Sequence, residues 1–143
     1  MTTDHIRAEA ISRQRARFLP MLGVLLLVAQ NGLLSHWDWR AVTIVQNLAW
    51  LVMAVSALLI LLTGGKWLMP PAIHALVDDE VSRENRRTAI TRAFAAAITT
   101  AMLVFVVAPF EPIDAQRAAH MIVSIGLAVG LLAFGLEERK SLG

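Results

Sequence analysis

The chain contains no cysteine and no tyrosine, and only 17% of its 143 residues are charged. Without cysteine it forms no disulfide, carries no thiol nucleophile and offers no thiolate to a metal ion. An average soluble domain is about 25% charged and about 45–50% apolar, whereas this chain is 57% hydrophobic. Charge this scarce argues against a soluble domain, a nucleic-acid binder and a disordered regulator. The net charge of +2 is too small to imply direct binding of nucleic acid.

Long runs without any charged residue dominate the chain. There are four of them, at residues 18–37, 41–65, 93–110 and 118–136. Their lengths of 20, 25, 18 and 19 residues suit a hydrocarbon core about 30 Å thick, because a helix rises about 1.5 Å per residue. The sequence therefore predicts an all-α integral membrane four-helix bundle, with residues 1–143 as a single transmembrane domain. We expect the spans at about 18–34, 41–62, 89–108 and 118–136.

Basic residues are distributed unevenly around these spans. Arg40 and Arg117 lie on one side, and the other eleven of the 13 basic residues lie on the opposite side. The positive-inside rule then places both termini and the segment 66–92 in the cytoplasm. The expected location is the bacterial inner membrane, with the chain crossing it four times and the lipid bilayer as its first partner.

The cytoplasmic segment 66–92 carries the most organised aqueous residues. No glycine or proline occurs from Ala72 to Ala108, so we expect a helical extension that continues into the third span, with a break near Asp78. Its charges are arranged for helical ion pairs, and two interpretations stay open: a solvated extension that meets anionic lipid, or a docking surface for a cytoplasmic protein or a second copy. The candidate docking residues are Asp79, Glu80, Arg83, Glu84, Arg86 and Arg87.

Amide side chains and one histidine form a second candidate site near the outer ends of the spans. This polar patch comprises Gln30, Asn31, Gln46, Asn47 and His120. Amides in hydrocarbon are costly unless they are hydrogen-bonded, so one interpretation is interhelical bonding. The other is a small vestibule that binds a solute or a proton, with His120 as its titratable group.

Catalytic constellations are missing from the spans. No Asp, Glu, Lys or Arg lies in the middle of a span, and no nucleophile, base and acid converge at one depth. We therefore expect no enzyme, no cofactor and no metal ion. Small residues do repeat at four-residue spacing, as Ala93, Ala97 and Ala101 on the third span and Gly126 and Gly130 on the fourth. Such stripes favour close helix contacts, either within the bundle or in a homodimer.

Several short motifs resemble those of a family of small bacterial four-span membrane proteins. The motifs are an Asp-Glu pair with an Arg/Asn cluster in 76–87, Phe110-Glu111-Pro112, Ala119-His120 and Leu136-Glu137-Glu138-Arg139. The resemblance implies no catalytic residue. Because some members occur beside small helix-turn-helix regulators, it implies such a regulator as a cytoplasmic partner.

Together these features favour a non-enzymatic inner-membrane interaction or regulatory protein that presents a charged cytoplasmic helix to a partner. The alternative function is a small transporter or channel subunit that uses the polar patch.

Overall fold

The computed structural model describes residues 3–33, 41–65, 80–111 and 113–141. These residues form helices and turns without any strand, which confirms the all-α prediction for this part of the chain. The helices are α1 (Thr3–Leu33), α2 (Ala41–Thr63), α4 (Glu80–Val107) and α5 (Ala115–Ser141). Three apolar segments are long enough to cross a membrane: Ile44–Thr63 in α2, Glu80–Val107 in α4 and Ala115–Lys140 in α5.

Helix α1 combines the polar N-terminal segment and the first apolar run in one element of 31 residues. Pro20 therefore lies inside a helix, although the sequence alone placed it at the start of a span. Side chains of α1 are described as far as Val28, and the apolar stretch among them runs from Ala16 to Val28. The expected end of the first span, near residue 34, lies outside the described residues.

Local sequence signals determine where α2 ends and where α5 begins. Helix α2 stops at Gly64 and Gly65, whose φ angles of 66° and 74° lie in the left-handed region that glycine adopts without steric cost. Helix α5 begins after Asp114, whose Oδ1 accepts a hydrogen bond of 2.8 Å from the backbone N–H of Arg117. This is the bond of an N-cap residue, and it satisfies a donor that the first turn leaves unpaired.

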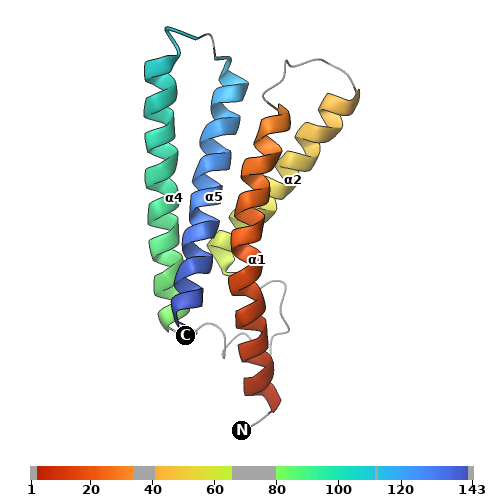
Figure 1. Cartoon of the computed structure of the whole chain (residues 1–143), viewed down its shortest axis with the longest axis vertical. Helices are drawn as coiled ribbons and strands as arrows, with labels where there is room; N and C mark the ends of the chain where they lie inside the picture. The colour runs from red at the N-terminus through yellow and green to blue at the C-terminus, as the bar shows by residue number, and fades with distance from the viewer. Residues whose placement is uncertain (1–2, 34–40, 66–79, 112, 142–143) are drawn as a thin grey trace.

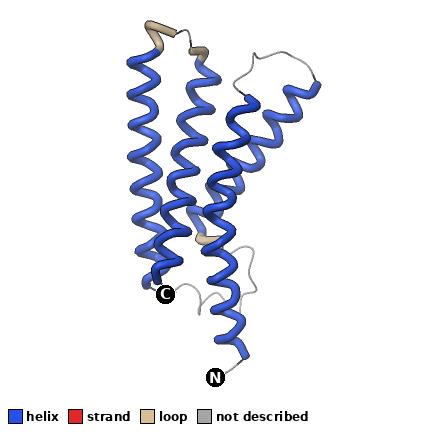
Figure 2. The backbone as a smooth tube through the Cα atoms, in the orientation of Figure 1, coloured by secondary structure: helices blue, strands red, loops and turns tan. Residues whose placement is uncertain are grey.

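Helix α5 is the centre of the bundle (Figure 1). It packs along α4 on one side and along α1 on the other, whereas α2 makes fewer contacts with each of its neighbours. The backbone trace shows α2 diverging from α1 toward the N-terminal end of α2 (Figure 2). The arrangement is thus a row of three helices with the fourth crossing behind it.

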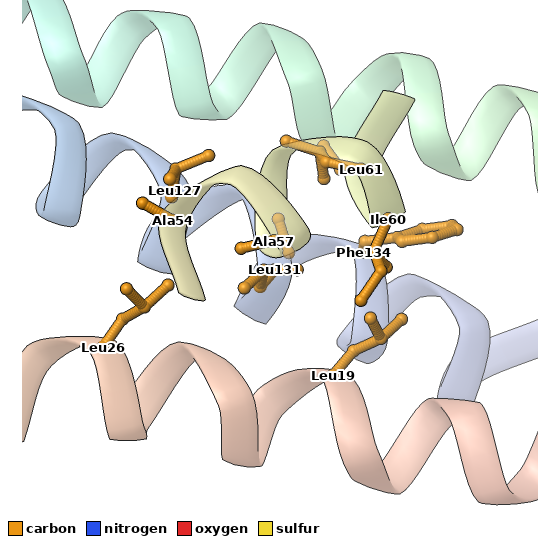
Figure 3. Packing of buried hydrophobic residues seen from close by; sticks show 11 residues of the cluster. Leu19, Leu26, Ala54, Ala57, Ile60, Leu61, Leu127, Leu131 and Phe134 are labelled. Carbon is orange, nitrogen blue, oxygen red and sulfur yellow. The ribbon is translucent and has the colours of Figure 1, made fainter. Parts of the chain in front are cut away.

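Apolar side chains from α1, α2 and α5 meet where these three helices converge (Figure 3). The largest buried ones are Leu19 and Leu26 of α1 and Leu131 and Phe134 of α5. Helix α2 contributes through its second half only, with Ala54, Ala57, Ile60 and Leu61. Because the first half of α2 is largely exposed, the bundle is closed at the end near Gly64 and open toward the other end of α2.

Glycines on α5 allow its two main neighbours to approach closely. A Cβ built on Gly126 would lie 3.0 Å from the Cβ of Ala97, and one on Gly130 would lie 2.8 Å from the Cβ of Ala93. The small-residue stripes of the third and fourth spans therefore face each other within one chain. On the other side of α5, a Cβ on Gly135 would lie 2.5 Å from Cδ of Pro20.

Large apolar side chains cover the outside of the helices. Phe94 of α4 is 67% exposed and Phe105 is 80% exposed. Exposed apolar surface on this scale is typical of helices surrounded by lipid, because lipid tails leave no hydrophobic penalty for such side chains. The structure thus supports a membrane location.

Helix α4 runs without interruption from Glu80 to Val107. This confirms that residues 80–92 continue into the third apolar segment as one helix. The break predicted near Asp78, and the interfacial helix before it, lie outside the described residues.

Candidate functional site

The candidate docking residues occupy the first two turns of α4. Asp79 lies outside the described residues. Glu80 opens the helix, and its side chain is exposed, as are those of Arg83, Glu84 and Arg87. Arg86 is half-buried. The structure therefore brings the five described members of the set together on one short helical segment.

This charged end of α4 is fixed to the last turns of α5. The hydroxyl of Ser82 donates a hydrogen bond of 2.9 Å to Oε1 of Glu138, a side chain that is only 6% exposed. One turn after the charged segment, Nη1 of Arg92 lies 2.9 Å from Oε1 of Glu137. Lys140 also contacts that carboxylate, at 3.4 Å. Carboxylates from α5 thus hold both ends of the segment 82–92.

The remaining charges of this segment are distributed around one side of α4. At about 100° per residue, the three arginines at 83, 86 and 87 lie within about 60° of Ile90 around the helix. Glu84 lies about 120° away from Ile90, on the side opposite Arg86. Glu80 lies only about 20° from Arg87 around the helix, so acidic and basic side chains adjoin on this surface.

An apolar groove runs between α2 and α4, with α5 as its floor. It has a volume of about 460 Å³. Its walls are formed by α2 from Trp50 to Leu62 and by α4 from Ile90 to Ala97, and its floor by α5 from Ile122 to Leu127. Ile90 is the lining residue nearest to the start of α4, so the charged segment of α4 lies beyond one end of this groove.

The polar patch is only partly assembled among the described residues. Gln30 and Asn31 belong to the last turn of α1, and their side chains lie outside the description. On α2, Gln46 is exposed and Asn47 is half-buried. The half-buried ring of His120 packs against Trp50, with 4.2 Å between the ring centroids.

Trp50 and Ser124 form a polar contact that the sequence did not predict. The indole Nε1–H of Trp50 donates a hydrogen bond of 3.0 Å to Oγ of Ser124, which is fully buried. A buried indole N–H generally has a hydrogen-bond acceptor. The position of Trp50 in the middle of a span was therefore the signal that an acceptor lies near it. The sequence could not identify the acceptor, because that depends on the rotation of α2 relative to α5. Beside this pair, Nε2 of His120 is buried and has no hydrogen-bond partner among the described residues.

The side chains of the charged segment, the groove and the polar patch are suited to binding and docking. Among the described residues, no three His, Asp or Glu side chains come close enough together to hold a metal ion. The charged end of α4, the groove and the Trp50–His120 contact are the candidate functional features of the described residues. Comparisons with protein-family models, with curated proteins and with solved structures find no match for this chain, so the geometry of these three features carries the functional argument.

Proposed function

We propose that this is a non-enzymatic interaction protein of the bacterial inner membrane, with both termini in the cytoplasm. Its helices hold the charged first turns of α4 at the membrane surface for a cytoplasmic protein partner. A small helix-turn-helix regulator or a second copy of the chain would suit this surface.

The observation that carries this proposal is the fixation of the charged segment. Ser82 and Arg92 bond to the carboxylates of Glu138 and Glu137, at 2.9 Å each, so the segment between them is held as a helix on α5. A surface that is already ordered loses little conformational entropy when a partner binds. The carboxylates of Glu80 and Glu84 are exposed on this segment and complement a partner with a basic surface.

Photo-crosslinking in intact cells tests this proposal. A photoreactive residue in place of Glu84 should form one defined adduct with a protein, whereas the same residue in place of Phe105, at the apolar end of α4, should capture lipid only. Adding Glu80→Lys should reduce the protein adduct at position 84 severalfold, because it reverses a charge that the partner contacts. If position 84 captures lipid alone, the docking function is wrong.

Transport is the second candidate function, and the unpaired Nε2 of His120 is the observation that favours it. A buried ring nitrogen without a partner is able to bind a proton or a polar solute transiently. Solute flux into proteoliposomes should then fall in His120→Ala and in Gln46→Ala. Flux that is absent, or that both variants leave unchanged, would remove the polar patch as a transport site.

A further inference from the structure

We infer that His120 forms a proton-sensitive contact between α2 and α5, and that a proton taken up by its ring releases the first half of α2 from α5. This inference needs neither the proposed protein partner nor solute flux. It rests on the buried ring nitrogen of His120 and on the two contacts that Trp50 makes with α5.

Trp50 connects the first half of α2 to α5. Its indole ring lies against the ring of His120, with 4.2 Å between the centroids, and its Nε1–H donates a hydrogen bond of 3.0 Å to Oγ of Ser124. The side chains that precede it on α2 are largely exposed, with Val42 at 67% and Val45 at 64%. The position of this half of α2 therefore depends largely on the two contacts of Trp50.

The buried position of His120 suits the neutral ring better than the cation. A neutral imidazole carries a hydrogen on one nitrogen and a lone pair on the other, whereas both nitrogens of the cation are donors. Nε2 of His120 is buried and has no hydrogen-bond partner among the described residues. A buried donor of a charged group without an acceptor is more costly than a neutral ring nitrogen. Protonation therefore favours a position of the ring in which Nε2 reaches water, at the expense of the contact with Trp50.

Few other titratable groups lie near this ring. The helices packed against α5 carry none over residues 18–33 of α1, 41–63 of α2 and 93–107 of α4. Glu111 is exposed in the turn before α5, and Asp114 and Arg117 form an ion pair with each other at 3.3 Å. The segment 34–40, which contains a histidine, an aspartate and an arginine, lies outside the described residues.

The pH range of the effect follows from the chemistry of imidazole. Imidazole in water takes up its proton near pH 6.5. Because the contact disfavours the cation, it is at full strength well above this pH and weakens as the pH falls below it. His120 lies five residues after the start of α5 at Ala115, or about 7.5 Å along the helix. In the orientation proposed above, the compartment outside the cytoplasm supplies the proton.

Distance measurements between two spin labels test the inference in the full-length protein. The chain has no cysteine, so Val45→Cys on α2 and Gln116→Cys on α5 place both labels at exposed positions without competing sites. The population with longer label–label distances should increase severalfold between about pH 8 and about pH 5, along a one-proton transition. A control pair at the closed end of the bundle, Leu62→Cys with Leu136→Cys, should give the same distances at both pH values.

Two variants separate titration from the strength of the contact. His120→Phe keeps an aromatic ring beside Trp50 without a titratable nitrogen, so the short distance should persist at both pH values. Ser124→Ala removes the acceptor of the indole N–H but leaves His120 in place. It should raise the population of longer distances at every pH and retain the dependence on pH.

Distances that do not change with pH in the protein with His120 intact would overturn the inference. Shorter distances in acid would also overturn it, because attraction of the cation to the indole ring would then outweigh the cost of burial. A full response that persists in His120→Phe would assign the proton to another group. These results are independent of the protein adduct at position 84 and of solute flux, so each proposal fails separately.

Discussion

Single residues of α5 decide how closely its neighbours pack. Gly126 and Gly130 admit the alanines of α4, and Gly135 admits the ring of Pro20 from α1. Neither the proline ring nor an alanine Cβ can rotate away from a clash, and the proline ring lies closest, at 2.5 Å against 2.8 Å and 3.0 Å for the alanines. Gly135 should therefore tolerate an added methyl group less well than the other glycines of this helix.

We expect Gly135→Ala to destabilise the bundle by up to about 2 kcal/mol. The added Cβ would lie 2.5 Å from Cδ of Pro20, and overpacking of this kind usually costs about 1–3 kcal/mol. Alanine also gains about 1 kcal/mol of helix propensity, which offsets part of that cost. The free energy of unfolding in mixed micelles measures the balance.

Pro20→Ala provides the control for this substitution. It removes the ring atoms that Gly135→Ala would meet, so the double variant should be more stable than Pro20→Ala alone. A double variant whose loss equals the sum of the two single losses would show that the two positions do not clash.

At the scale of the elements, α4 and α2 differ in the contacts that fix them in the bundle. The Ala93–Gly130 and Ala97–Gly126 contacts fix α4 on α5, and ion pairs extend this contact to the charged end. Only the second half of α2 is buried, and its first half is exposed. The groove exists because α2 meets α4 near Leu61 and diverges from it toward Trp50.

Proline substitutions should have different effects in the interior of α4 and in its first turn. Arg87→Pro removes a backbone donor and clashes with the preceding turn, at a cost of about 3 kcal/mol. Glu80→Pro occupies the first position of the helix, where proline is tolerated. Hydrogen exchange should show that amides 82–90 lose protection in Arg87→Pro and retain it in Glu80→Pro. Exchange of these amides at random-coil rates in the unmodified protein would contradict a rigid charged segment.

At the scale of the whole molecule, the orientation in the membrane determines which partners reach each end. Eleven of the 13 basic residues lie in sequence segments on the same side of the expected spans as the start of α4, and this predicts that the docking surface faces the cytoplasm.

Impermeant thiol labelling should confirm this orientation. The chain has no cysteine, so a single introduced thiol gives an unambiguous signal. Ala115→Cys, at the exposed start of α5, should be labelled in intact cells, and Glu84→Cys should be labelled only after the membrane is opened. Glu84 is preferable to Ser82 as a probe because Ser82 is half-buried and bonded to Glu138. Labelling of Glu84→Cys alone in intact cells would reverse the topology and place the docking surface outside.

The sequence by itself determined the helical class and the bounds of α2. The expected span 41–62 corresponds to Ala41–Thr63, because charge-free runs of membrane length leave few alternatives and the glycine pair ends the helix. It also predicted that residues 80–92 extend the third apolar segment, since no glycine or proline interrupts them. The position of Pro20 was not predicted, because α1 continues through the polar N-terminal segment.

The tertiary structure decided which residues meet. Hydropathy sets the length of a span but carries no information on its rotation, so neither the bond from Trp50 to Ser124 nor the contact of Gly135 with Pro20 was available from the sequence. It also decided that the small-residue stripes of α4 and α5 face each other within one chain. The groove also depends on how α2, α4 and α5 pack together, since all three helices line it. Crossing geometry of this kind arises from the side chains of three helices at once, and for that reason no single segment of the sequence encodes it.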